Sequence, residues 1–248
     1  MYLGVSLKTY KGISGTLEYV EALRGVCERA KEAGIVFFII PDQVSLGVVP
    51  RPLAGGALLG AQDCYHEDHG AYTGTVSPAN LAELGVGIVE IGHAERRRLF
   101  HETDEDVALK SEAAVRNGLI PLVCVGEQTE QTDPMAAARV CIDQVRAVTD
   151  RVAGDREVVV AYEPVWAIGR PAPASPEYVV AVVERIKEAY STRPGGLKVI
   201  YGGSAGVGLY GKLAPTLDGL FLGRFGHDPL KVSEILDEAI QLKAKYNM

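Results

Sequence analysis

The sequence has few cysteines, and none of them forms the short pairs that metal and redox motifs use. Its four cysteines, Cys27, Cys64, Cys124 and Cys141, are scattered without a CxxC pair, and each stands in an apolar context. Such cysteines are typical of reduced thiols that pack as small hydrophobic residues. We therefore expect neither a disulfide framework nor a structural metal site.

Long apolar runs and an excess of basic residues are also absent. No apolar run approaches the roughly 18 residues that a membrane helix requires, and the start, MYLGVSLKTY, lacks a secretory pattern. The formal net charge is −7, without a basic stripe that would suit nucleic acid. We expect a soluble cytoplasmic protein that binds neither membrane nor nucleic acid. An anionic ligand would need a local site, because the overall charge has the wrong sign for it.

No linker rich in proline, glycine or serine and no low-complexity segment divides the chain. A length of 248 residues fits one large domain or two small ones, since α/β barrels reach this size as single domains. Short apolar runs alternate with amphipathic segments from end to end, which is the pattern of repeated βα units. Eight runs are predicted to be strands: Leu3–Leu7, Val36–Ile40, Ala57–Ala61, Ile88–Ile91, Leu119–Cys124, Val158–Tyr162, Lys198–Tyr201 and Gly219–Leu222.

The segments between these runs have helical periodicity and helix boundary signals. Two buried stripes with their flanks are predicted at Val179, Val182, Val183, Ile186 and Ala189, and at Val232, Ile235, Leu236, Ala239, Ile240 and Lys243. Helix starts are predicted where a capping residue precedes proline, and helix ends where glycine follows: Ser77, Ser175 and Asp228, and Gly34, Gly85 and Gly118. Eight βα units favour a single (β/α)8 barrel over residues 1–248, and an open doubly wound sheet is the main alternative.

The carboxyl ends of the strands meet on one rim of such a barrel, and ligands bind there. The stretch VVVAYEPVWAIG, residues 158–169, is typical of a strand covered on both faces that delivers one carboxylate, Glu163, to this rim. A glutamate in this place is also compatible with a solvated turn. Other predicted strand ends carry a lysine, a histidine, further acids and glycine-bearing loops: Lys8, Gln62, Asp63, His93, Glu95, Glu127, Ser204, Gly223 and Arg224.

Four stretches resemble the triosephosphate isomerase family. IGHAERRRLF (91–100) is similar to its histidine loop, AYEPVWAIG (161–169) to its catalytic glutamate and lid, YGGS (201–204) to its phosphate loop and GAQDCYHEDHGAYTG (60–74) to its dimer loop. They occur in the family's order, and the resemblance covers essentially the whole chain. It implies a TIM barrel and a homodimer that isomerises a small sugar phosphate through an enediolate, without cofactor or metal.

The resemblance implies a catalytic group of four residues. Glu163 is the base that removes a proton from the carbon next to the substrate carbonyl. His93 stands at an expected helix start, where the helix dipole disfavours imidazolium, so a neutral ring would donate to the enediolate oxygen. Lys8 would point its ammonium at the same oxygen and at the phosphate, and Glu95 is expected to bond Lys8 or His93.

The resemblance also implies a phosphate site. Gly169, Ser204 and the backbone of Gly223 and Arg224 are expected to supply N–H donors, with a short helix after Leu222 adding its positive end. Glycine turns alone are a weak signal, and their place after the seventh and eighth predicted strands favours this interpretation. No metal is assigned, because the four remaining histidines share no ligand spacing: His66, His69, His101 and His227.

The chain departs from the family pattern around the substrate. Ser6 stands where the family has asparagine, Ala94 replaces a serine, and Gly223 is followed by Arg224 instead of a second glycine. The guanidinium can bind an anion in bidentate fashion or close part of the pocket. The lid tip, residues 169–174, carries two prolines in place of a Thr-Gly-Lys-Thr type of sequence, which predicts a stiffer tip or a different closing surface.

These changes spare the proton-transfer residues, so we expect the same chemistry on an altered substrate. Ser6 and the Gly223–Arg224 pair are similar to those of superfamily isomerases that act on erythrulose phosphates. The predicted reaction interconverts L-erythrulose 1-phosphate and D-erythrulose 4-phosphate. The alternatives are a triosephosphate isomerase proper, acting on dihydroxyacetone phosphate and glyceraldehyde 3-phosphate, and a non-catalytic sugar-phosphate-binding barrel. A phosphate-binding barrel of another reaction type, such as a synthase, agrees less well with the set Lys8, His93 and Glu163.

Overall fold

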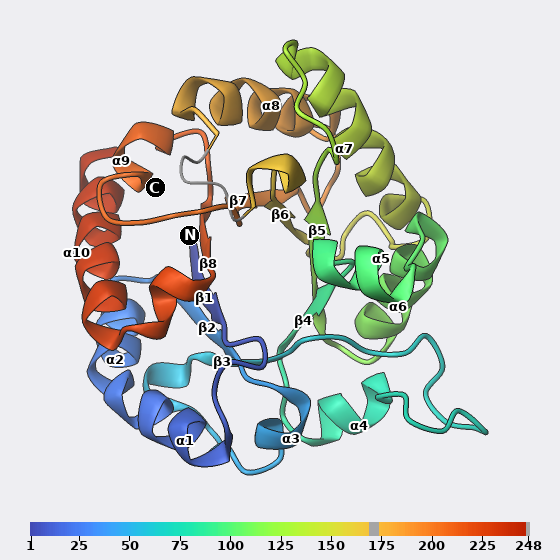
Figure 1. Ribbon diagram of the computed structural model, residues 1–248, viewed down its shortest axis with the longest axis vertical. Coiled ribbons are helices and arrows are strands. Elements are labelled where there is room, and N and C mark those ends of the chain that lie inside the picture. Colours follow the sequence, from blue (N-terminus) through green and yellow to red (C-terminus); the bar gives the residue numbers. More distant parts are fainter. Residues whose placement is uncertain (169–173, 247–248) are drawn as a thin grey trace.

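The computed structural model describes residues 1–168 and 174–246, and within these ranges eight parallel strands close into a barrel in the order β1 to β8 (Figure 1). The closed sheet confirms the predicted (β/α)8 TIM barrel and excludes the open doubly wound sheet. The strands are β1 Tyr2–Ser6, β2 Val36–Ile40, β3 Leu58–Ala61, β4 Ile88–Ile91, β5 Ile120–Val125, β6 Val159–Tyr162, β7 Lys198–Tyr201 and β8 Gly219–Leu222. Four of them have the predicted bounds, and the other four differ by one residue at an end or in register.

Helices surround the barrel and cover the outer face of its strands (Figure 1). They are α1 Ile13–Ala22, α2 Arg24–Glu32, α3 Gln43–Leu46, α4 Pro78–Glu83, α5 Ala94–Phe100, α6 Asp104–Arg116, α7 Pro134–Thr149, α8 Pro176–Ala189, α9 Tyr210–Leu213 and α10 Pro229–Tyr246. The short 3-10 helices of the described ranges are η1 Ala54–Gly56, η2 Val165–Ala167 and η3 Arg224–His227.

The strands bury both faces, as their apolar runs predict. One face packs inside the barrel, where Phe38 is fully buried against Phe221 with ring centroids 5.6 Å apart. Gly4 makes room for this ring, because a Cβ at position 4 would lie 2.0 Å from it. The other face packs against the helices. Burial of one such large side chain contributes about 1.5–3 kcal/mol, so the barrel and its helical cover stabilise each other.

The predicted helix boundaries are confirmed. The side chains of Ser77, Ser175 and Asp228 accept hydrogen bonds from backbone N–H groups of the first turn, and Gly34, Gly85 and Gly118 adopt φ of 64°, 84° and 74°. Both predicted stripes are largely buried, and Ile240 and Lys243 at the flank of the second are half-buried. Ala189 is exposed, because the stripe of α8 continues four residues after Ile186 at Tyr190, whose hydroxyl donates to the Ile142 carbonyl oxygen at 3.0 Å.

The four cysteines are buried and free, in keeping with their predicted role as small packing residues. Among the helices of the described ranges, none has the length and apolar character needed to cross a membrane.

Candidate active site

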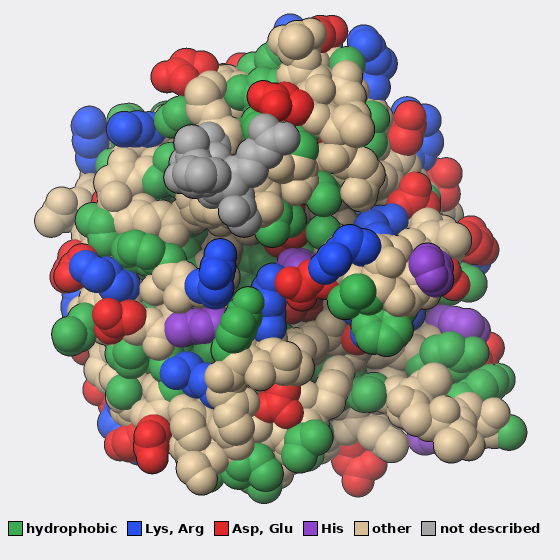
Figure 2. Space-filling model, viewed as in Figure 1, with side chains coloured by type: hydrophobic (Ala, Val, Ile, Leu, Met, Phe, Trp, Pro, Cys, Tyr) green, Lys and Arg blue, Asp and Glu red, His purple; other side chains and the backbone are tan. Residues whose placement is uncertain are grey.

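A cavity of about 740 Å³ opens at the carboxyl ends of the strands. Figure 2 shows basic, acidic and histidine side chains gathered around a hollow on this face. The structure brings seven of the nine predicted site residues together on the cavity wall: Lys8, His93, Glu95, Glu163, Ser204, Gly223 and Arg224. Ser6 is buried at the end of β1, and Gly169 lies outside the described residues.

Glu163 follows β6 directly, and its side chain is buried beside the cavity. Its N–H donates to the Val125 carbonyl oxygen at 2.8 Å, which fixes the backbone at the strand end. Its carboxylate packs against Gly202, where a Cβ would lie 2.6 Å from Oε1. Oε2 is buried and makes no hydrogen bond to a described residue. Burial, and then the charge of Glu90, raise the pKa of Glu163 to about 8, so its carboxylate is a much stronger base than an exposed one.

His93 is the N-cap of α5, which confirms the predicted helix start. Its Nδ1 accepts a hydrogen bond from the Glu95 N–H at 3.1 Å, so the neutral ring carries its proton on Nε2. That Nε2 lies 3.5 Å from Oε2 of Glu163. Burial, and then the nearby charge of Lys8, lower the pKa of His93 to about 4. The ring is therefore a neutral N–H donor facing the same space as the Glu163 carboxylate.

Lys8 reaches into the cavity from the end of β1. Its Nζ forms an ion pair with Glu95 Oε1 at 2.8 Å, so Glu95 bonds the lysine, one of the two predicted partners. Burial alone would lower the pKa of Lys8, but the hydrogen bond and charge of Glu95 outweigh it and raise that pKa. The backbone of Lys8 is left-handed, with φ 46°, and its carbonyl oxygen accepts from Gln62 Nε2 at 2.8 Å. Such a conformation costs on the order of 1–3 kcal/mol and is common at functional sites.

Glu90 is a residue of this region that the sequence interpretation missed. It lies inside β4 and is buried, and its Oε2 accepts a hydrogen bond from Ser6 Oγ at 2.9 Å. Its Oε1 lies 4.0 Å from Nε2 of His93. Burial raises the pKa of Glu90 to about 7. The signal was present in the sequence, because a single acid interrupts the apolar run IVEI, but this acid lies inside a strand, whereas the predicted rim residues follow strands.

The predicted phosphate loops form one wall of the cavity. Gly203 and Ser204 follow β7, and their backbone N–H groups donate to no acceptor within residues 1–168 and 174–246. Arg224 is exposed at the start of η3 and forms no ion pair in these ranges. The wall therefore offers free N–H donors and one cation to an anion. The described residues contain no group of three or more His, Cys, Asp or Glu side chains placed to hold a metal ion.

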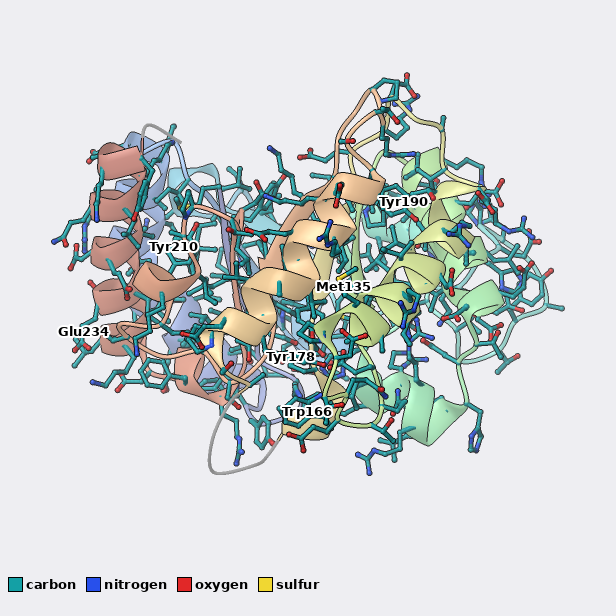
Figure 3. The ribbon with its side chains drawn as sticks, turned by 90° about the horizontal axis from the view of Figure 1, so that it is seen from above. Met135, Trp166, Tyr178, Tyr190, Tyr210 and Glu234 are labelled. Atoms are coloured by element: carbon teal, nitrogen blue, oxygen red, sulfur yellow. The ribbon has the colours of Figure 1, made fainter. Side chains whose placement is uncertain are left out.

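Glu127 holds the segment that follows Glu163. It is buried at the end of β5, and its Oε1 accepts from Trp166 Nε1 at 2.7 Å and from the Tyr178 hydroxyl at 3.0 Å. Figure 3 shows Trp166 and Tyr178 near one another, beside the start of α8. Through these contacts Glu127 holds Trp166 and Tyr178, which lie near the two ends of the predicted lid. The two prolines of its tip lie outside the described residues.

Comparisons with known proteins agree with this arrangement. The family model described as Triosephosphate isomerase matches residues 1–239. The chain is 43% identical over 253 residues to an L-erythrulose-1-phosphate isomerase from Pectobacterium atrosepticum, covering 98% of this chain and 97% of the relative. It is 39% identical over 231 residues to a protein of the same name from Brucella abortus, covering 90% of both chains. A third, from Rhizobium rhizogenes, is 38% identical over 237 residues, covering 90% of this chain and 88% of the relative.

Proposed function

The chain belongs to the triosephosphate isomerase family, and on this premise we propose that it interconverts L-erythrulose 1-phosphate and D-erythrulose 4-phosphate. The observation that carries the proposal is the convergence of three groups on one cavity. Glu163 is a base of raised pKa, the neutral His93 ring faces it at 3.5 Å, and Lys8 adds a positive charge. Removal of a proton next to a carbonyl needs this combination of base, donor and cation.

In the proposed reaction Glu163 removes the proton from C3 of L-erythrulose 1-phosphate, whose carbonyl is at C2. The electron pair forms the C2–C3 double bond of an enediolate, and the negative charge moves to the C2 oxygen. His93 Nε2–H and the Lys8 ammonium stabilise that oxygen, and the hydroxyl proton moves from the C3 oxygen to the C2 oxygen. Glu163 then returns its proton to C2. The product has its carbonyl at C3, which is D-erythrulose 4-phosphate when the chain is numbered from the other end.

Two observations support a four-carbon substrate over a three-carbon one. The relatives from Pectobacterium atrosepticum and Brucella abortus are both named for L-erythrulose 1-phosphate. Two of the departures from the family pattern that lie in the described residues, Ser6 and Arg224, are on the cavity wall or directly beneath it. Ser6 places a short hydroxyl where the family carries an amide, and Arg224 offers a guanidinium beside the phosphate loops.

A comparison of kcat/KM in one assay tests the substrate. We expect the erythrulose phosphates to exceed dihydroxyacetone phosphate and glyceraldehyde 3-phosphate by at least tenfold, since one methylene-sized group is worth about 10- to 200-fold in discrimination. A preference for the trioses would instead identify a triosephosphate isomerase proper. Thermal stabilisation by erythrulose phosphate without exchange of its C3 proton into D2O would identify a binding protein.

We also propose a homodimer, on the resemblance of residues 60–74 to a dimer loop. This loop extends from the barrel between β3 and α4 (Figure 1). It exposes Tyr72, and it borders a second cavity of about 560 Å³ whose wall includes the exposed ring of Phe100. Exposed aromatic rings beside a cavity are typical of contact surfaces. A neighbouring subunit's loop would cover them.

Sedimentation tests the homodimer. We expect a dimer at micromolar concentration, and we expect Tyr72→Asp to shift the protein to monomers, because a charge would replace an apolar contact. Leu230→Asp, on the exposed start of α10, is the matched control and should remain dimeric. A monomeric wild-type protein would contradict the proposal.

We propose further that residues 1–248 form a single domain and that the protein is cytoplasmic. The four free, buried thiols support the second, since reduced cysteines are typical of that compartment. A single cooperative unfolding transition and cell fractionation are the respective measurements.

A further inference from the structure

Glu90 is a buried acid that forms no ion pair with any described residue of opposite charge. It points into the barrel on the same face of β4 as Ile88, among apolar residues. Within the described ranges no lysine or arginine forms an ion pair with it, and Ser6 Oγ is its hydrogen-bond donor. Burying a carboxyl group in such surroundings is costly unless it is paired. A role in barrel stability alone does not account for it.

Oε1, the carboxyl oxygen of Glu90 that Ser6 does not bond, faces the reacting groups. Oε1 of Glu90 lies 4.0 Å from Nε2 of His93, and that nitrogen lies 3.5 Å from Oε2 of Glu163. A substrate whose C2 oxygen accepts a hydrogen bond from Nε2 at about 2.9 Å therefore lies beside Glu90, and a hydroxyl group on C4, two carbons away, can come within hydrogen-bond distance of Oε1. Ser6 fixes the opposite oxygen of the carboxyl group at 2.9 Å, which holds it in this orientation.

The four-carbon substrate has a hydroxyl group that needs a partner at this point. L-Erythrulose 1-phosphate corresponds to dihydroxyacetone phosphate with a hydroxymethyl group on the carbon that loses its proton. Its extra hydroxyl is therefore carried next to the reacting carbon, at the end away from the phosphate. A buried hydroxyl left without a hydrogen bond weakens binding, and a carboxylate is a strong acceptor for it.

We propose that Glu90, oriented by Ser6, determines specificity by accepting a hydrogen bond from the hydroxymethyl end of the four-carbon substrate. This inference rests on the proposed function. It gives Ser6 a role that a short side chain serves well, since a serine hydroxyl donates to the carboxyl group and leaves space beside it. Triose phosphates lack this additional hydroxymethyl group and therefore make no use of the contact.

The test compares two substrates in three variants. Glu90→Met has similar length and removes the acceptor, and it suits an apolar barrel interior. We expect its kcat/KM to fall about 10- to 100-fold more for L-erythrulose 1-phosphate than for dihydroxyacetone phosphate, as loss of a hydrogen bond to a charged group predicts. The effect of the lost charge on Glu163 acts on both substrates and cancels in the ratio of the two kcat/KM values. Glu90→Gln should recover part of the loss, because its amide oxygen still accepts. Ile88→Met is the matched control on the same face of β4 and should keep the wild-type ratio.

The outcomes separate this inference from the proposed function. Equal losses on both substrates in Glu90→Met would overturn it and assign Glu90 to general support of His93. No loss on either substrate would overturn it as well, while a wild-type preference for erythrulose phosphate would still uphold the proposed function. A wild-type preference for dihydroxyacetone phosphate would reject the proposed substrate before any variant is compared. Thermal unfolding of each variant excludes a folding defect as the cause.

Discussion

Glu163→Gln is expected to lower kcat for erythrulose phosphate isomerisation by about 10²- to 10⁴-fold, the range typical of a general base. Glutamine has the shape of glutamate and fits against Gly202, but its amide cannot accept the proton from carbon. Binding should survive, because Lys8 and the phosphate loops are unchanged. Steady-state kinetics measures the first effect. The thermal shift produced by erythritol 4-phosphate, which has no carbonyl and cannot react, measures the second.

The pH dependence of the stability of Glu163→Gln provides a control, because the sign of its difference from wild type can be predicted. The pKa of Glu163 is raised from the ordinary 4.5 to about 8. Between these pH values the folded protein binds a proton that the unfolded chain has lost, so the free energy of unfolding falls as pH rises through this window. Glutamine removes that effect. Glu163→Gln should therefore unfold at a higher temperature than wild type at pH 9, and at a similar temperature at pH 4.

The matched substitution is Glu157→Gln, which exchanges an exposed glutamate bonded to the Tyr2 hydroxyl at the other end of the barrel. Its kcat should stay within about twofold of wild type, as is usual for surface substitutions. If Glu163→Gln retained more than about a tenth of the wild-type kcat, the loss would be smaller than a general base accounts for, and Glu163 would not be the base.

The barrel was predictable from the sequence because its signals are local. Runs such as Val36–Ile40 are apolar, short and bounded by polar segments, and their positions agree with the strands to within one residue. The rim residues were predictable from the same strand positions, because the residue that follows a parallel strand lies at the carboxyl-end rim of the barrel. Lys8, His93 and Glu163 meet in one cavity although 155 residues separate the first from the last. The prediction that Ala189 is buried was wrong, because Tyr190, and not Ala189, packs against the core in the last turn of α8.

What the sequence did not predict depends on contacts between distant residues. Ser6 and Glu90 are 84 residues apart, and their hydrogen bond exists only because the closed sheet brings the inner faces of β1 and β4 together. The proton position on His93 likewise depends on the geometry of the Glu95 N–H, which fixes Nδ1 as the acceptor. Periodicity assigns a residue to a face but does not identify its partner across the barrel.

Lys8→Met should reduce kcat/KM by about a thousandfold. One charge pair at about 4 Å is worth about 4 kcal/mol at an effective dielectric near 20, and each 1.36 kcal/mol corresponds to a factor of about ten in rate. Methionine has a similar length and no charge, so it removes the attraction for the enediolate and phosphate with little change in packing. Glu95 loses its partner, but its side chain is 43% exposed and remains hydrated, so the protein should fold.

A second measurement on Lys8→Met follows the His93 ring. The charge of Lys8 helps to lower the pKa of His93, so that pKa should rise towards its ordinary value of 6.5 when the charge is removed. NMR titration of the ring nitrogens measures this shift, which a purely structural role for Lys8 would not produce. Lys11→Met is the matched control, since it removes a neighbouring lysine whose Nζ lies over the Tyr19 ring. Equal losses of kcat/KM in both variants would assign the effect to the general field of the cavity, and a loss confined to Lys8→Met to direct contact with the substrate.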